Sequence, residues 1–227
     1  MADSLAALAR EVTVCRRCPR LVKWREGVAA DPPRRYRGQR YWARPLPGFG
    51  DPQASIVIVG LAPAAHGGNR TGRIFTGDRS GDWLFAALHR AGFANQPTSE
   101  SADDGLRLDG AYVTAVNRCP PPGNRPTTEE RDNCLPYLAR ELRLLGGARV
   151  LVPLGAFAWA GSLLAVAELG VELPRPRPRF GHGAEAEIGP YTLLGCFHPS
   201  QQNTFTGKLT EPMIDAVFSR ARELAGG

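Results

Sequence analysis

Residues 55–60 read Ser-Ile-Val-Ile-Val-Gly, a short apolar run that is rich in β-branched side chains and ends in glycine. Such a run is typical of a strand that is buried on both faces of a sheet. A helical pattern follows at about residues 80–91. The same order recurs as a strand at 111–117 with a helix at 127–145, a strand at 149–154 with a helix that ends near 168, and a strand at 191–197 with a helix at 210–225. These pairs predict one α/β domain over residues 1–227, a three-layer sandwich with a four-stranded parallel sheet between helices.

The segments around these pairs carry weaker patterns. Apolar residues at helical spacing predict a short amphipathic helix at 5–12. Thr127 and Glu130 have the spacing of a capping box, which places the start of the second long helix. Residues 172–190 are rich in proline and arginine and then in glycine, and we expect a loop or an edge hairpin there.

The chain is basic, with 28 Lys and Arg residues against 22 Asp and Glu residues and a net charge of +6. A basic surface attracts polyanions, which makes nucleic acid a natural partner without proving it. Arginines and aromatic residues gather at 34–44, where they either grip phosphates and bases or form a loop that packs on itself. The sequence shows neither a signal-peptide pattern nor an apolar run of roughly 18 residues, so we expect a soluble, cytoplasmic monomer.

Four of the five cysteines indicate one metal centre. Cys15 and Cys18 form a C-x-x-C motif, whereas Cys119 and Cys134 lie far downstream. In a reducing compartment such cysteines are better explained as metal ligands than as disulfides. Four thiolates bind zinc or an iron–sulfur cluster, and their softness does not choose between the two. Cys196 lies in an apolar run, and we expect it in the core.

The polar loops of the chain follow the predicted strands. They span residues 60–78, 117–124 and 198–200. Ligands of an open parallel sheet bind at the carboxyl ends of its strands, so these loops should form one rim with the functional site. The first loop is glycine-rich, but it lacks both the Gly-Lys-Ser/Thr ending of a P-loop and the G-x-G-x-x-G spacing of a dinucleotide fold. A hydrolase of free nucleotides is therefore disfavoured.

The order and spacing of four elements resemble family 5 of the uracil-DNA glycosylases. These elements are the C-x-x-C motif, Gly-Leu-Ala-Pro-Ala at 60–64, Phe-Thr-Gly-Asp at 75–78 and His-Pro-Ser at 198–200. The resemblance implies a [4Fe–4S] cluster on Cys15, Cys18, Cys119 and Cys134. It also implies excision of uracil and other deaminated bases from DNA, double-stranded and also single-stranded.

Cleavage of the N-glycosidic bond leaves negative charge on the base and positive character on the sugar, so the site needs a hydrogen-bond donor and a negative partner. We assign the donor role to His198, which could instead be a strand-end histidine bonded to backbone. Asp78 stabilises the sugar or orients water, and it is also a good N-cap for the following helix. The resemblance places a functional asparagine at Asn124, whose ordinary role would be that of a turn residue.

The flipped base also needs a pocket. Phe75 is placed to stack on the base, although it could be an anchor that pins a long loop to the core. Backbone N–H groups of Gly60, Leu61 and Ala62 are further donors, and Asn117 is a candidate for reading the edge of the base.

Contacts with DNA fall to polar residues of the first and last rim loops. His66 is the first polar residue after Ala64, the position where neighbouring glycosylase families place a catalytic Asp or Asn, and it could activate water or bind a phosphate. Phe205 or Gln202 would fill the space left by the flipped base. The predicted DNA-binding residues are His66, Asn69, Arg70, Ser200, Gln202 and Asn203.

Two hypotheses follow. The first is a monofunctional glycosylase, because Lys23 and Lys208 are the only lysines and neither has the apolar setting of a nucleophile. The second is a non-catalytic nucleic-acid-binding protein with a structural zinc site. The combination of Phe75, Asp78 and His198 on the rim favours catalysis.

Overall fold

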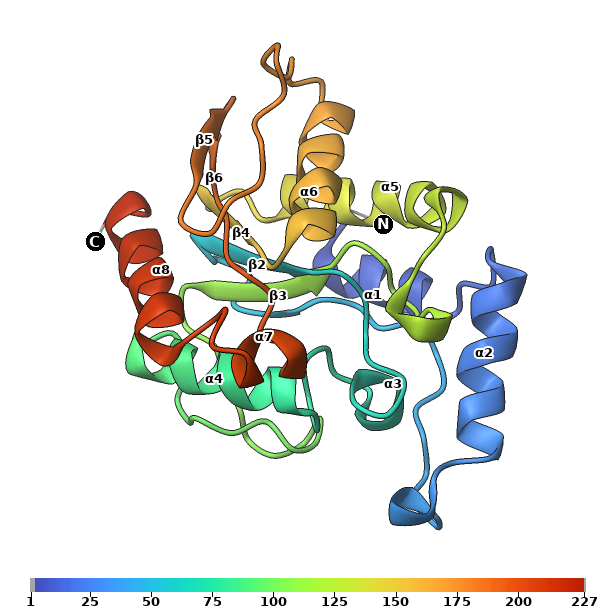
Figure 1. Cartoon of the computed structure of the whole chain (residues 1–227). Coiled ribbons are helices and arrows are strands. Elements are labelled where there is room, and N and C mark those ends of the chain that lie inside the picture. Colours follow the sequence, from blue (N-terminus) through green and yellow to red (C-terminus); the bar gives the residue numbers. More distant parts are fainter. Residues whose placement is uncertain (1–2, 227) are drawn as a thin grey trace.

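The computed structural model describes residues 3–226 and contains a central mixed sheet (Figure 1). The six strands have the order β1-β3-β2-β4-β6-β5. The inner four are parallel, and each edge strand is antiparallel to its neighbour. The strands are β1 (Phe49–Gly50), β2 (Ile56–Gly60), β3 (Ala111–Ala115), β4 (Val150–Pro153), β5 (Glu185–Ile188) and β6 (Tyr191–Leu194).

The prediction of a four-stranded parallel sheet is therefore wrong at the two edges. Strand β1 has two residues, which is too short for any periodicity, and it pairs Phe49 with Val113 of β3. Strand β5 forms a hairpin with β6 and exposes Glu185 and Glu187, so it lacks the apolar run of a central strand. Residues 172–190, expected to be a loop or an edge hairpin, include β5, which pairs with β6 in a hairpin at the edge of the sheet.

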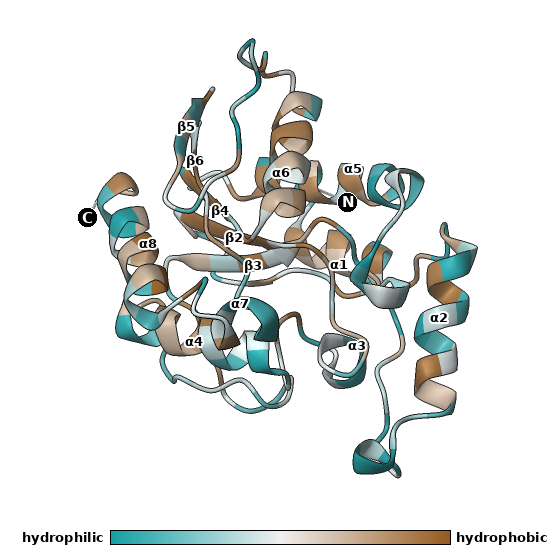
Figure 2. Ribbon diagram, in the orientation of Figure 1, coloured by the Kyte–Doolittle hydropathy of each residue, from teal (hydrophilic) through white to brown (hydrophobic). Residues whose placement is uncertain are grey.

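Helices cover both faces of the sheet, as the apolar strands require (Figure 2). Ile56 and Ile58 of β2 pack in one core with α4 and α8, while Val57 and Val59 pack in the other with α5 and α6. The predicted helices are confirmed, and α2 and the short α3 and α7 are additional. The helices are α1 (Leu5–Thr13), α2 (Pro19–Ala30), α3 (Gly68–Thr71), α4 (Arg79–Arg90), α5 (Thr128–Leu144), α6 (Ala156–Glu168), α7 (Gln201–Phe205) and α8 (Glu211–Leu224), with 3-10 turns η1 (Arg34–Tyr36) and η2 (Pro122–Asn124).

The capping box begins α5 as predicted. The backbone N–H of Glu130 donates to Thr127 Oγ1 at 3.2 Å, and the Thr127 N–H donates to Glu130 Oε2 at 2.8 Å. No helix among residues 3–226 combines the length and apolar character that crossing a bilayer requires.

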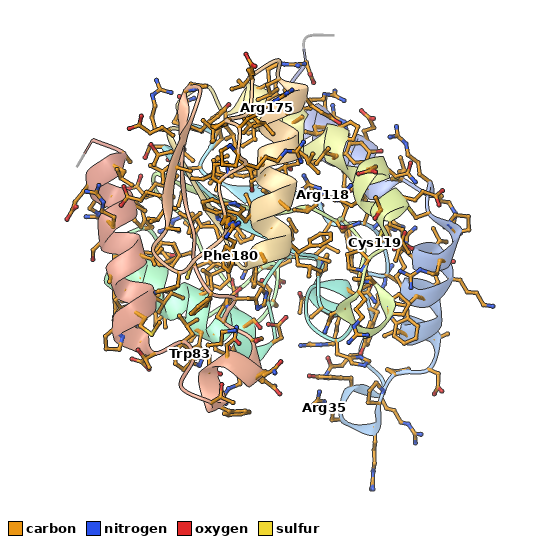
Figure 3. All side chains as sticks on the ribbon, turned by 45° about the horizontal axis from the view of Figure 1, so that its top comes forward. Arg35, Trp83, Arg118, Cys119, Arg175 and Phe180 are labelled. Atoms are coloured by element: carbon orange, nitrogen blue, oxygen red, sulfur yellow. The ribbon has the colours of Figure 1, made fainter. Side chains whose placement is uncertain are left out.

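A buried ion pair fixes the loop after β3. Arg118 Nη2 lies 2.6 Å from Glu141 Oε2, and both side chains are almost completely buried. The Leu46 N–H donates to the carbonyl of Arg118, so Arg118 also holds in place the segment that precedes β1. This pair holds the segment that carries Cys119 against α5 (Figure 3).

Candidate active site

A cavity of about 510 Å³ opens at the carboxyl ends of the parallel strands. Its walls come from the loop after β2, from η2 after β3 and from the segment between β6 and α7, so the predicted rim is present. The lining residues are Leu61, Ala62, Ala64, Phe75, Asp78, Arg79, Ser80, Asn124, His198, Ser200, Gln201 and Gln202.

Phe75 forms one wall and is held in place by close packing. Its backbone φ is 54°, a left-handed conformation that is costly for an aromatic residue. A Cβ placed on Gly60 would lie 2.7 Å from the ring, so glycine at that position makes room for it. The ring centroid lies 5.8 Å from that of His198. Phe75 thus anchors its loop and also presents aromatic surface to the cavity, whereas its stacking on a base stays a prediction.

His198 presents an imidazole to the cavity without a protein partner for its N–H. Among residues 3–226, hydrogen bonds to this residue involve only its carbonyl, which accepts from the Ser200 N–H and from Asn203 Nδ2, each at 2.8 Å. The alternative considered from the sequence was an imidazole bonded to backbone, and among the described residues the His198 ring forms no such bond. Burial lowers the pKa of His198 to about 4, so the ring is neutral near pH 7. A neutral ring still carries one N–H for a ligand.

Asp78 caps α4 and lines the cavity, and its role at the sugar or the water stays a prediction. Its Oδ1 accepts from the Gly81 N–H at 3.0 Å, which caps α4, and its carboxyl group also lines the cavity. Burial raises the pKa of Asp78, and hydrogen bonds from the backbone N–H groups of Gly81 and Ser80 oppose that rise. A partly desolvated carboxylate next to a cavity is suited to interact with positive charge there.

Asn124 lines the cavity from η2, the turn that follows β3. It adopts a positive φ of 56°, as expected for a turn asparagine, and its N–H donates to the Pro121 carbonyl at 3.1 Å. Its side chain is exposed and lines the cavity. Leu61 and Ala62 line the cavity as predicted, whereas Gly60 is buried behind the Phe75 ring.

Two predicted site residues are placed elsewhere. Asn117 is fully buried, does not line the cavity, and donates from Nδ2 to the Glu130 carbonyl at 3.0 Å. Asn69 is also fully buried and donates to the Arg25 carbonyl at 3.2 Å. Neither asparagine lines the cavity in this structure, and the predicted contacts of Asn117 with a base edge and of Asn69 with DNA stay predictions. Each asparagine instead satisfies a backbone carbonyl of a neighbouring helix, which the sequence did not reveal.

His66 and Arg70 lie outside the cavity lining. His66 Nδ1 is 2.9 Å from the Tyr41 hydroxyl, and burial together with Arg35 and Arg70 lowers the pKa of His66. The Arg70 guanidinium donates to the carbonyl of His66 at 2.8 Å and to that of Gly77 at 3.0 Å. These contacts brace the loop that carries Phe75 and Asp78.

The α7 side of the cavity carries the predicted polar residues. Ser200 Oγ accepts from the Asn203 N–H at 3.3 Å and so caps α7, while Ser200 and Gln202 line the cavity. Phe205 is 67% exposed, and the Arg79 guanidinium lies 4.4 Å from its ring centroid. The sequence reasoning missed Arg79, Ser80 and Gln201, although Arg79 directly follows Asp78.

Of the four predicted metal-ligating cysteines, Cys15 and Cys18 lie between α1 and α2, Cys119 lies in the loop after β3, and Cys134 lies in α5. These segments are neighbours, because Arg25 Nη1 donates to the Cys15 carbonyl at 3.4 Å and to Cys119 Sγ at 3.0 Å, and Asn133 Nδ2 lies 3.6 Å from Cys18 Sγ. Repulsion from Cys15 helps to raise the pKa of Cys18, Cys119 and Cys134, which requires proximity, although burial is the largest cause in each case. Among residues 3–226, no group of three or more His, Cys, Asp or Glu side chains has the arrangement of a metal-ion site. Cys196 is fully buried in the core, as predicted.

Arg25 accompanies these thiols. It is 2% exposed, its Nη1 donates to Cys119 Sγ at 3.0 Å, and its Nε is buried without a partner among the described residues. The carboxylate of Glu26 lies 3.9 Å away. A buried guanidinium is costly unless negative charge is close by, and here sulfur atoms are its near neighbours.

The fold is thus an α/β sandwich whose inner parallel strands carry, at their rim, a cavity lined by an aromatic residue, a neutral histidine and a carboxylate. Residues 47–222 match the uracil DNA glycosylase superfamily, and the chain belongs to it.

The chain is similar along nearly its whole length to proteins named type-5 uracil-DNA glycosylase. It is 53% identical to that of Mycobacterium tuberculosis over 227 residues, covering 99% of this chain and 83% of the relative. It is 49% identical to that of Thermus thermophilus over 221 residues, covering 97% and 98% of the two chains. For the protein of Pyrobaculum aerophilum the identity is 44% over 212 residues, with 93% and 89% covered.

Proposed function

We propose that this protein is a DNA repair enzyme that flips uracil and other deaminated bases out of DNA and hydrolyses the N-glycosidic bond to leave an abasic site. The observation that carries the proposal is the unpartnered, neutral imidazole of His198 facing the cavity beside Phe75. The names of the relatives indicate the substrate class. The cavity contains an aromatic ring, a hydrogen-bond donor and a carboxylate, which are the groups that base excision requires.

The flipped base enters the cavity and stacks on Phe75. One base–aromatic contact contributes about 1–3 kcal/mol, which offsets much of the few kcal/mol that unstacking costs. The His198 N–H donates to the base oxygen that gains negative charge as the bond breaks. A neutral donor suits this step, since its proton stays on the imidazole while the base leaves as an anion.

The carboxylate of Asp78 stabilises the positive character that develops on the sugar and holds the attacking water. Asn124, across the cavity, presents its amide to the base or to that water. Lys23 and Lys208, the only lysines in the chain, are both absent from the cavity lining. The reaction is therefore a hydrolysis without a covalent lysine intermediate.

The α7 segment contacts the DNA on the side of the cavity that Ser200 and Gln202 form, and Asn203 follows them in α7. Phe205, largely exposed at the end of α7, is the residue we expect to fill the space left by the base. Duplex DNA is the principal substrate, and single-stranded DNA, which needs no unpairing, is a second one.

We further propose that Cys15, Cys18, Cys119 and Cys134 hold a [4Fe–4S] cluster. Four cysteine thiols in neighbouring segments match the donor set of such a cluster, and buried Arg25, whose Nη1 donates to Cys119 Sγ, suits an anionic group at that position. The cluster would cross-link α2, α5 and the loop that carries Asn124. The residues of the chain carry out the excision.

The test is an excision assay with a uracil-containing duplex, followed by alkaline cleavage of abasic sites, and a visible spectrum with metal analysis of the same sample. We expect strand cleavage that depends on uracil, and a brown protein that contains iron and sulfide. Lack of cleavage with every deaminated base would leave the non-catalytic hypothesis. A colourless protein loaded with zinc would overturn the cluster proposal alone.

A further inference from the structure

One strongly charged surface has no role in the site described above. Residues 34–44, here called the arginine loop, carry five exposed arginines, and the sequence has no acidic residue between Asp31 and Asp51. Within residues 3–226, these five side chains form no ion pair, whereas the half-buried Arg140 and the exposed Arg220 are paired with carboxylates. The five are Arg34, Arg35, Arg37, Arg40 and Arg44. Their charge is uncompensated and suits an anionic partner.

Aromatic packing orders part of this loop. The Arg35 and Arg70 guanidinium groups lie 4.7 Å and 4.5 Å from the Tyr36 ring centroid, and the His66 ring stacks on Tyr36 at 5.8 Å. A guanidinium stacked on a ring keeps its N–H groups free at the edge, where a phosphate can accept them. Ordering before binding also lowers the entropic cost of contact.

The arginine loop is joined to the wall of the cavity through α3. The N–H groups of Trp42 and Ala43 donate to the carbonyls of Arg70 and Asn69 at 3.0 and 3.1 Å. Arg70 also donates to Gln39 in the loop, at 3.0 Å, and to Gly77, the residue before Asp78, as described above. Figure 1 shows α3 between α7 and the turn η1 of the arginine loop. DNA that delivers a base to the cavity therefore passes beside this loop.

We propose that the arginine loop binds the phosphates of the duplex that flanks the flipped base. This inference rests on the proposed function for its partner, and it adds a second contact region beyond α7. The contact is sequence-independent because it involves charge and backbone phosphates rather than base edges. It positions the duplex by one flank while α7 engages the DNA at the cavity.

The test compares two variants with the same loss of charge. The first is Arg34→Gln/Arg35→Gln/Arg37→Gln. The matched control is Arg175→Gln/Arg177→Gln/Arg179→Gln, in an exposed segment at the opposite end of the molecule, as the labels of Arg35 and Arg175 show (Figure 3). Binding of both to an undamaged duplex is measured over a salt titration.

Each lost phosphate contact lowers the slope of log K against log salt by about 0.9 for duplex DNA. We expect the first variant to lose up to about three such increments and the control to keep the wild-type slope. Equal slopes in the first variant and the wild type would overturn the proposal, as would an equal loss in the control. Because Arg35 packs on Tyr36, the double variant Arg34→Gln/Arg37→Gln repeats the test with that stacking intact.

This measurement separates the two proposals, because it needs no excision. If the wild type leaves uracil in place but its salt slope differs from that of the first variant, the proposed enzymatic function is wrong and the proposed phosphate-binding surface stands. If the wild type excises uracil but its salt slope equals that of the first variant, the enzymatic function stands and the proposed phosphate-binding surface is wrong. Duplexes shortened on one side at a time identify the flank that is bound. We expect the loss of one flank to lower the affinity of the wild type to that of the variant, and the loss of the other flank to have no such effect.

Discussion

Replacement of His198 by alanine isolates the proposed donor, because its imidazole has no hydrogen-bond partner among the described residues and its loss leaves none of their polar groups unsatisfied. Loss of one donor to a developing anion typically raises a barrier by about 2.7–4 kcal/mol, which is about 100–1,000-fold in rate. We expect a decrease of that size in the single-turnover rate of uracil excision, measured with excess enzyme and alkaline cleavage of the product. Excision within tenfold of the wild type would refute the donor role.

The same substitution has a signature in stability. A pKa of about 4 for His198, against an ordinary value of 6.5, means that folding favours the neutral ring by about 3 kcal/mol. Between these values the unfolded chain binds more protons than the folded chain. The wild type therefore loses up to that free energy of unfolding as the pH falls from 6.5 to 4, and the alanine variant does not. Parallel unfolding curves for the two proteins across this window would show that the imidazole is not buried as described.

The remaining predictions concern three other residues. Asp78→Asn retains an N-cap side chain but removes the charge, so the excision rate should fall while the melting temperature stays close to that of the wild type; an excision rate of Asp78→Asn equal to that of the wild type would contradict the catalytic role. Gly60→Ala would force the Phe75 ring aside, since the new Cβ would lie 2.7 Å from it. We expect about 1–3 kcal/mol of destabilisation by denaturant unfolding and weaker excision, with Gly146→Ala, in open space, as the control. Arg25→Gln should lower the iron and sulfide content and speed the bleaching of visible absorption in air, and unchanged content would remove the proposed link between Arg25 and the cluster.

Much of the fold followed from local patterns. The inner strands are continuous apolar runs of β-branched residues, and the capping box at Thr127 and Glu130 needs only neighbours in sequence. The edge strands could not be predicted in the same way. Strand β1 is too short to show a period, and β5 is half exposed, so only pairing with β3 and β6 makes either a strand.

The sequence by itself determined which loops gather at the rim, because parallel strands bring their carboxyl ends to one edge of the sheet. It thus placed Phe75, Asp78, Asn124 and His198 around one site. The tertiary structure alone decided which polar side chains face the cavity. Asn69 and Asn117 occupy the same loops, yet each turns inward to a helix carbonyl, and Arg25 is buried beside Cys119. The orientation of such a side chain depends on hydrogen-bonding groups that are distant in the sequence. Those groups become neighbours only when the helices have packed against the sheet.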